Sequence, residues 1–569
     1  MSSVAKRLHM KKPAAAPREL HPALLFALLF TFLFITHVPL LRLPYFWDEA
    51  GYYIPAARDL LVTGSLVPET TLSNAHPPLV MGYLALWWRL SGFTPAVTRT
   101  AMLLISALAL LGIYRLSKRV APAEVAVATT LCTALYPVFF AQSTLAHLDM
   151  AAAAFTLWAL DAYVADRPVR LGIFFSLATL AKETAIIAPF AILGWEWLCR
   201  VRDRRRGTST CLFPAPSWKR SAALLFAIVP LLVWFAYHYV RRGFVFNSIF
   251  FQYNVLATLH PVRILMSFLI RTWQSVGYMN MIFLSLAAAL AMQMPPLSEG
   301  RDERPRIALP VQYVFVLLIV TYAVVMSIIG GAELARYLLP VIPLFILLCV
   351  STLRRRLRRW TLVVGIVCLG FVVGLFVNPP YGFAPEDNLA YRDYVLLHKF
   401  GDGYVDQHYA HERVLTAWPA SDEITRPYLG YVRQPMSVVP VDNFSLEEML
   451  NVYPKKSQFD VALVFSTKYE ASNYFSHLRW WQNLKKRFFG YHEDLPPDAV
   501  AQLLGGRVIA QQRLKGQWIA VIELPQEREA KAVIPTEASA RVKLASRLAE
   551  RRISSLPRPI SAAGDRSRF

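Results

Sequence analysis

Long apolar runs without charged residues alternate with short polar segments over the first two thirds of the chain. The runs lie near residues 22–41, 96–114, 125–146, 150–165, 170–181, 184–198, 221–240, 272–292, 308–330, 337–353 and 360–377. A helix needs about 20 apolar residues to cross the hydrocarbon core of a bilayer. The pattern predicts a polytopic α-helical membrane domain over residues 22–377, with about 11 transmembrane helices.

Three of these runs are too short to span a bilayer. Charged residues limit them to 150–160, 171–181 and 184–195. A helix that ends early leaves its end at membrane depth, which is tolerated only against protein or a water-filled cavity. Asp149, Lys182 and Glu183 lie at these ends, and an ionisable residue inside a membrane points to a functional site. We therefore expect a polar cavity in the outer half of the protein.

Positive charge is concentrated in alternate loops. With a cytoplasmic N-terminus, the inside loops hold 25 Lys and Arg and the outside loops hold 10. These inside loops are 1–21, 115–124, 161–170, 196–220, 299–306 and 353–359. Lys and Arg collect in cytoplasmic loops, which accounts for the formal net charge of +22 without a nucleic-acid partner. An odd number of crossings places the C-terminus outside.

The composition changes after residue 377. Residues 413–418, 437–441 and 459–465 are predicted to be buried strands. Helical patterns occur in "SLEEMLNVY" and "PDAVAQLL", and Lys515-Gly516 marks the turn of a final hairpin. We expect a small extracytoplasmic α/β domain over 378–525 and a disordered tail over 526–569. None of the five cysteines lies beyond Cys368, so this domain is not built on disulfides.

The first outside loop, residues 42–95, has unusual features. It begins with the aromatic run Tyr45-Phe46-Trp47, followed directly by Asp48 and Glu49. The segments "DEAGYYIPAARDLLVTG" and "HPPLVMGYLALWWRLSGF" are predicted to be helices lying in the membrane interface. A structured loop of this kind indicates an active site roofed at the bilayer face.

Five motifs follow one another along the chain: the Asp-Glu pair after the first span, "NAHPPLVMGYLALWWRLSG", "HLD", "LAKETAIIAPF" and "GAELARYLLPVIPLF". In this order they resemble the membrane-embedded GT-C glycosyltransferases, which include protein O-mannosyltransferases and lipid A aminoarabinose transferases. The resemblance covers roughly residues 20 to 350. Aminoarabinose transferases carry Glu-Lys-Pro-Pro in the first loop, whereas this chain has Ala75-His76-Pro77-Pro78, which is closer to the mannosyltransferase-like members.

The resemblance implies an inverting glycosyltransferase of the bacterial inner membrane, with a polyprenyl-phosphate sugar as donor. The acceptor would be a lipid, a glycan or a protein. The catalytic base of the family falls on Asp48, with Glu49 beside it. Some relatives use a divalent cation and others do not, and the sequence requires none.

Such a transfer needs a carboxylate to take the proton of the acceptor hydroxyl and positive groups to hold the phosphate. We place Asp48, Glu49 and Asp149 among the catalytic candidates. The candidates for donor or substrate binding are His76, Lys182, Glu183, Arg336 and Tyr337, and Arg241 or Arg242 is also on that side.

Each candidate also has a structural interpretation. Asp48 could cap the helix that follows it, Glu49 could favour that helix through its dipole, and Asp149 could cap its own helix. Lys182 and Glu183 could pair with each other or with Asp149. Arg336 could snorkel to the interface without any role in the site, and His76 could be a neutral, packed histidine.

Other interpretations remain open. "HYAHE", with His408, His411 and Glu412, has three potential zinc ligands but no fourth nearby, so no metal ligands are assigned. A transporter or flippase of lipid-linked sugars would also need a polar cavity, although the internal repeat typical of transporters is not visible. An envelope glycan polymerase or ligase is a third option.

Overall fold

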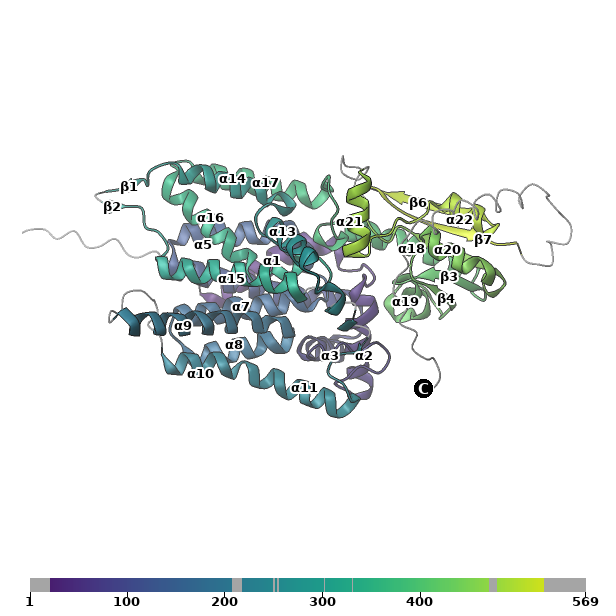
Figure 1. Ribbon diagram of the computed structural model, residues 1–569, viewed down its shortest axis with the longest axis horizontal. Helices are drawn as coiled ribbons and strands as arrows, with labels where there is room; N and C mark the ends of the chain where they lie inside the picture. The colour runs from purple at the N-terminus through teal and green to yellow at the C-terminus, as the bar shows by residue number, and fades with distance from the viewer. Residues whose placement is uncertain are drawn as a thin grey trace, which may run out of the picture.

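The computed structural model shows a bundle of long helices with a five-stranded sheet at one end of it (Figure 1). It describes residues 21–206, 217–248, 251–252, 255–300, 302–329, 331–469 and 478–525. The predicted tail and nearly all of the basic arm lie outside these residues.

Apolar helices that run along the long axis of the molecule form the bundle (Figure 1). The first of them are α1 (Pro22–His37), α4 (Pro95–Val120), α5 (Ala123–Leu135), α6 (Pro137–Gln142), α7 (Leu148–Val164), α8 (Pro168–Ala181) and α9 (Ile187–Arg206). They are followed by α10 (Trp218–Phe226), α11 (Ile228–Arg242), α13 (Pro261–Val276), α14 (Met281–Met292), α15 (Leu309–Ile329), α16 (Ile342–Arg356) and α17 (Trp360–Phe376).

Six helical stretches in the described part of the chain are long and apolar enough to cross a bilayer. They are Pro22–Leu40, Pro95–Val120, Glu183–Arg202, Trp218–Arg242, Pro261–Met292 and Leu309–Ile329. The chain is therefore an integral membrane protein. The count of eleven crossings stays a prediction.

Three predicted boundaries in the membrane part are wrong. The run 125–146 is divided into α5 and α6, because Pro137 has no amide hydrogen to continue the first helix. The run after Glu183 does not stop at Glu196, whose carboxylate pairs with Arg220 at 2.6 Å, so α9 continues through a neutralised charge. The predicted outside loop 241–271 contains most of α13, which begins at Pro261.

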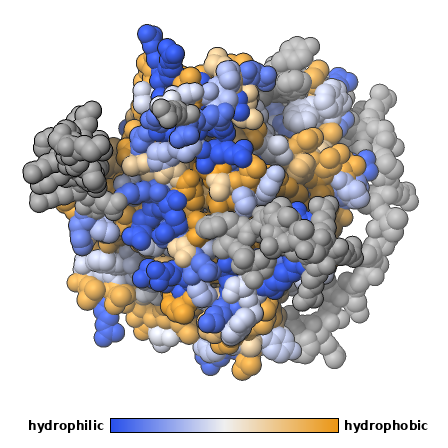
Figure 2. Space-filling view, turned by 90° about the vertical axis from the view of Figure 1, so that its left-hand side faces the viewer, coloured by the Kyte–Doolittle hydropathy of each residue, from blue (hydrophilic) through white to orange (hydrophobic). Residues whose placement is uncertain are grey.

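The described parts of the predicted inside loops after residue 114 gather at the end of the bundle away from the sheet (Figure 1). Figure 2 shows hydrophilic residues spread over this end, with hydrophobic ones between and around them. Arg354 joins two of these loops, since its guanidinium lies 2.8 Å from Glu124 and 3.3 Å from Glu299. The Arg-rich loops therefore lie at the end of the bundle opposite the sheet (Figure 1).

Two short helices of the first loop cover the end of the bundle that faces the sheet. They are α2 (Ile54–Thr63) and α3 (Leu79–Ser91), which form within the two predicted helical segments and pack on each other (Figure 1). Asp59 on α2 accepts hydrogen bonds from the amides of Glu69 and Thr70, both at 2.8 Å, and so holds the connecting segment. The first loop is thus an ordered roof.

The sheet has strands in the order β4-β3-β5-β7-β6. Their bounds are β3 (Arg413–Ala417), β4 (Ser437–Val441), β5 (Val461–Phe465), β6 (Arg507–Leu514) and β7 (Gln517–Glu523). The first three are parallel and the last two form the expected hairpin, with Lys515 and Gly516 both at positive φ, which matches the twist of adjacent strands. A separate ribbon, β1 (Ser298–Glu299) with β2 (Asp302–Glu303), lies at the other end of the molecule (Figure 1).

Helices surround the sheet and join it to the bundle. They are α18 (Ala390–His408), α19 (Ala420–Thr425), α20 (Leu446–Val452), α21 (Arg479–Phe489) and α22 (Pro497–Leu504). β3 pairs with β4 on one side and with β5 on the other. Strands are therefore added on opposite sides of β3, and the topological switch point lies between β3 and β5. The carboxyl ends of parallel strands at such a switch point are where open α/β sheets bind ligands.

Candidate active site

A cavity of about 700 Å³ lies between the bundle and the carboxyl ends of β3 and β5. Asp48, His76, Lys182 and Arg336 line it from the side of the bundle, and Trp418 from the side of the sheet. Most of its remaining wall is aromatic or aliphatic. A concave, largely apolar pocket with a few convergent polar groups is the usual form of a small-molecule site.

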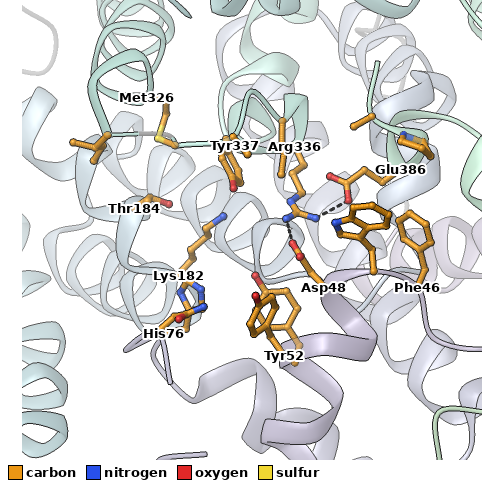
Figure 3. Close-up of a pocket in the computed structure, with 18 of the residues that line it drawn as sticks. Phe46, Asp48, Tyr52, His76, Lys182, Thr184, Met326, Arg336, Tyr337 and Glu386 are labelled. Atoms are coloured by element: carbon orange, nitrogen blue, oxygen red, sulfur yellow. Dashed lines mark hydrogen bonds and ion pairs between the residues drawn. The ribbon is translucent and has the colours of Figure 1, made fainter. Parts of the chain in front are cut away.

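Arg336 is the centre of the polar part of this cavity. It lies in the short turn Ala335–Leu338 before α16 and is 1% exposed. Its guanidinium donates hydrogen bonds to Asp48 and, at 2.8 Å, to Glu386, which approach it from different sides (Figure 3). Its Nε lies 3.4 Å from Asp149, and its Nη1 lies 2.9 Å from Nδ1 of His147. A buried cation so surrounded is fixed in position and does not snorkel.

Asp48 reaches the cavity from the start of a π-helical turn, Glu49–Tyr53, that continues into α2. Its side chain makes no cap hydrogen bond to that turn and extends to Arg336 instead (Figure 3). The residue before it, Trp47, has φ of +48°, which is uncommon for a bulky side chain and occurs most at functional sites. The capping interpretation of Asp48 is therefore wrong.

Lys182 supplies a second positive charge to the cavity. It follows the end of α8, is 5% exposed, and donates a hydrogen bond of 2.6 Å to Asp149. Its ammonium also lies 4.1 Å from the ring centre of Tyr337. Asp149, in the first turn of α7, thus links the two cations, but it lies behind them and makes no cap bond. Asp149 therefore orients Lys182 and Arg336 and is a positioning residue, not a catalytic residue.

His76 and Glu183 form a second pair at the edge of the cavity. Nδ1 of His76 lies 3.0 Å from a carboxylate oxygen of Glu183, and both side chains are partly exposed. Glu183 therefore pairs with His76 and not with Lys182. Ala75, directly before His76, has φ of +58°, so Asp48 and His76 each follow a residue in the left-handed region.

Glu49 does not share the position of Asp48. Its carboxylate is fully buried, lies 3.3 Å from Arg99, and accepts hydrogen bonds from the amides of Phe46 and Ala146 at 2.8 and 2.6 Å. Arg99 in turn donates to the carbonyl of Pro44 at 2.7 Å. These contacts tie the start of the first loop to α4 and to the segment before α7, which is a structural role. Expecting a catalytic role for Glu49 does not fit this geometry.

Glu386 and Asp387, which were not among the candidates predicted from the sequence, lie after α17 in the turn Pro385–Asp387. Burial raises the pKa of Glu386 to about 8, although Arg336 opposes this. Burial also raises the pKa of Asp387 to about 7, opposed by the hydroxyl of Tyr278, which donates to it at 2.6 Å. An acidic pair directly after the last predicted span, as Asp48-Glu49 follows the first, was the available signal.

The walls of the cavity differ in chemistry. Phe46, Trp47, Tyr52 and Trp418 form an aromatic wall next to Asp48, with the rings of Trp47 and Trp418 5.0 Å apart. The opposite wall is apolar and comes from α15 and from the segment after α11, with Phe246, Phe251, Val255, Met326 and Ile329. Thr467, Lys468 and Tyr469, which follow β5, close the side toward the sheet.

Two further groups of candidates lie outside the cavity wall. Arg242 donates to the carbonyl of Pro68, and Arg241 lies beside it at the end of α11. In "HYAHE", His408 stacks on Tyr404 at 4.4 Å and lies within 3.1 Å of its carbonyl. The geometry supports no site at either place.

Comparison with known proteins supports the resemblance that the motifs indicated. Residues 75–234 match the family model described as dolichyl-phosphate-mannose-protein mannosyltransferase, which confirms the resemblance to the GT-C glycosyltransferases over that stretch. None of the curated protein sequences matches the chain.

Solved structures show a distant likeness. The apo state of ArnT from Cupriavidus metallidurans has a TM-score of 0.49 and 16% identity, over 88% of this chain and 97% of that chain. The same protein bound to undecaprenyl phosphate has a TM-score of 0.49 and 15% identity over the same shares. The oligosaccharyltransferase AglB from Archaeoglobus fulgidus, in complex with an inhibitory peptide and a dolichol-phosphate, has a TM-score of 0.41 and 11% identity, over 91% of this chain and 75% of that chain. These likenesses are too distant to carry a functional assignment.

Proposed function

We propose that the protein is a membrane glycosyltransferase that moves a sugar from a polyprenyl-phosphate donor to an acceptor hydroxyl at the outer face of the membrane. The observation that carries the proposal is that a first-loop carboxylate, Asp48, pairs with the buried cation Arg336 in a cavity that a second buried cation, Lys182, also lines. The family model on residues 75–234 supports this class of reaction and a mannosyltransferase-like member of it.

The charges of the cavity suit a phosphate leaving group. Arg336 and Lys182 can hold phosphate oxygens through charge-assisted hydrogen bonds. Burial raises the pKa of Glu386, which favours its protonated form and leaves more of the charge of Arg336 for a phosphate. Asp48 and the phosphate would then compete for the guanidinium, so that binding of the donor releases a carboxylate oxygen of Asp48.

The reaction follows from this placement. The acceptor hydroxyl attacks the anomeric carbon on the face opposite the phosphate, and Asp48 takes the hydroxyl proton as the new bond forms. The bond from the anomeric carbon to the phosphate oxygen breaks with its electron pair, and polyprenyl phosphate leaves. Displacement from the opposite face inverts the anomeric centre.

Different walls of the cavity suit the donor lipid and the sugar with its acceptor. The apolar wall between α15 and the segment after α11 suits the polyprenyl chain, since both elements belong to the membrane part. The aromatic wall with Trp418, at the carboxyl end of β3, suits the sugar and the acceptor. The end of the bundle with the Arg-rich loops lies opposite, and by the positive-inside rule this supports a cavity outside the cytoplasm.

The test is a transfer assay with the purified protein in liposomes. Radiolabelled polyprenyl-phosphate mannose, aminoarabinose and other sugars are supplied with lipid and peptide acceptors, and products are separated by chromatography. We expect transfer from at least one donor, with release of polyprenyl phosphate. If lipid-linked sugar crosses the bilayer without being consumed, the protein is a transporter and the proposal fails.

A further inference from the structure

His398, Asp402 and Glu423 form a buried cluster on the sheet side of the molecule. His398 and Asp402 are one turn apart on α18, and Glu423 lies on α19. One potential ligand atom from each side chain lies within 4.8 Å of the other two. All three residues are at most 1% exposed. The cluster is separate from the cavity and takes no part in the proposed reaction.

The polar atoms of this cluster are poorly satisfied. Nδ1 of His398 lies 2.5 Å from a carboxylate oxygen of Glu423, but Nε2 of His398 and the other oxygen of Glu423 have no hydrogen-bond partner among the described residues. Neither oxygen of Asp402 has a donor in that part of the chain either. An unsatisfied buried acceptor costs about 1 to 3 kcal/mol, and more when it is charged.

In the part of the chain that the structure describes, no Lys or Arg pairs with the two carboxyl groups. Their basic neighbour is His398, and burial lowers the pKa of its imidazole to about 4. Burial is the main cause that raises the pKa of both Asp402 and Glu423, and their carboxyl groups also lie against each other. The surrounding walls are aromatic, with His398 stacked on Tyr394 at 4.1 Å and edge-on to Phe465 at 4.5 Å. Two buried acids in such a place need either shared protons or a cation.

We propose that His398, Asp402 and Glu423 bind a divalent transition-metal ion of the zinc type. One imidazole and two carboxylates are ligands that Zn²⁺ accepts, whereas Mg²⁺ and Ca²⁺ prefer oxygen alone. Zinc ligands lie about 2.0 to 2.2 Å from the ion, so shifts of less than about 1 Å would close the cluster. Binding releases any protons on the two carboxyl groups and gives the open oxygens a partner.

The place of the cluster in the fold indicates a structural ion. It joins α18 to α19, the helix that follows β3. The ring of Tyr394 stacks on His398. Its centre also lies 5.5 Å from the ring centre of Trp47 and 5.3 Å from that of Phe46, and both of these residues line the cavity. An ion here would hold the two helices together behind the aromatic wall of the cavity.

The experiment measures metal content in the intact, full-length protein. It is purified in detergent with a tag that does not bind metals, desalted, and analysed by inductively coupled plasma mass spectrometry. The variants are Asp402→Asn and, as a matched control, Asp406→Asn, one turn further on the same helix, where the carboxylate pairs with Arg433 at 2.8 Å. We expect close to one ion per chain in the wild type and in Asp406→Asn, and almost none in Asp402→Asn.

A second measurement is independent of how the variants fold. The wild-type protein is stripped with a chelator, and its thermal unfolding is followed with added Zn²⁺, Mn²⁺ or Mg²⁺. We expect Zn²⁺ to raise the midpoint by several degrees in a concentration-dependent way, and Mg²⁺ to leave it unchanged.

Two results would overturn the proposal. One is a wild-type protein without metal whose midpoint does not respond to Zn²⁺ or Mn²⁺. The other is an Asp402→Asn variant that is folded, more stable than the wild type, and equal to it in metal content. Either would mean that the two carboxyl groups are held by shared protons.

Discussion

Asp48 and Arg336, which are 288 positions apart in the chain, form an ion pair inside the cavity. The first comes from the roof over the bundle and the second from the turn before α16. Their contact brings the carboxylate that follows the first span to the guanidinium near the end of the membrane part. It also means that the proposed base starts the reaction bound to the group that would hold the donor phosphate.

Glu49 and Asp48 are predicted to behave differently when each is replaced by its amide. Glu49→Gln leaves Arg99 buried beside a neutral group, and removal of one partner of a buried ion pair costs about 3 to 5 kcal/mol. We expect a clear fall in the thermal midpoint of Glu49→Gln in detergent, measured by intrinsic fluorescence. A variant with an unchanged midpoint and no transfer activity would show that Glu49 is catalytic after all.

Lys182 is predicted to contribute to affinity for the donor. Removal of one charge-assisted hydrogen bond costs about 1.5 to 3 kcal/mol, roughly a 10- to 150-fold weaker binding of polyprenyl phosphate to Lys182→Ala. Competition with a labelled donor measures this affinity. Lys219→Ala, on α10 at the far end of the bundle, is the control and should bind as the wild type does. Equal affinity in both variants would remove Lys182 from the phosphate site.

Gly51 is predicted to set the position of Trp418 in the aromatic wall. A Cβ atom at Gly51 would lie 2.9 Å from two ring atoms of Trp418, so Gly51→Ala must displace the indole. We expect a KM for the acceptor that is raised roughly 5- to 30-fold, equivalent to about 1 to 2 kcal/mol. Gly82→Ala on α3, where the added atom would meet only Leu60 at 3.8 Å, should be neutral. An unchanged KM in Gly51→Ala would mean that Trp418 does not contact the acceptor.

Glu386 is predicted to make stability depend on pH. Its folded pKa of about 8 lies above its ordinary value of 4.5, so its contribution to stability is complete below about pH 4.5 and is lost as the pH rises through 8. The charged groups that act on it are Arg336, which lowers the pKa, and Asp387, Asp48 and Asp149, which raise it.

The expected slope from this one proton is at most about 1.4 kcal/mol per pH unit. Thermal unfolding between pH 5 and 8 should therefore show a midpoint that falls more steeply with rising pH in the wild type than in Glu386→Gln. Parallel profiles would mean that Glu386 is already ionised throughout this range.

The sequence predicted much of the local structure correctly. The apolar runs and the positive-inside bias located most helices and the end of the bundle that carries the Arg-rich loops. Strands β3, β4 and β5 lie within one or two residues of the predicted segments, because buried β-branched runs between turn residues have few alternatives. Charges inside α9 misled the prediction, since Arg220, which neutralises Glu196, comes from a different helix.

The site was predicted only in part. Short helices with charged ends indicated the polar cavity, and Asp48, Lys182 and Arg336 do converge there. Asp48 precedes a π-helical turn and Glu49 begins it, and their side chains point in different directions. The sequence alone could not show that the two acids have different roles. Trp418 reaches the cavity only through the docking of the sheet on the bundle, a long-range contact that no local pattern encodes.

The most direct test of the proposed mechanism compares transfer by the wild type, Asp48→Asn and Glu69→Gln in liposomes, with unfolding midpoints measured in parallel. Glu69 is an exposed acid of the same first loop and serves as the matched control. Loss of a positioned base should lower kcat roughly 100- to 10,000-fold in Asp48→Asn, while Glu69→Gln retains full activity. The midpoint of Asp48→Asn should fall less than that of Glu49→Gln, because Asp48 is partly exposed and Asp149 still faces Arg336. Full transfer by a folded Asp48→Asn variant would contradict the assignment of Asp48 as the base.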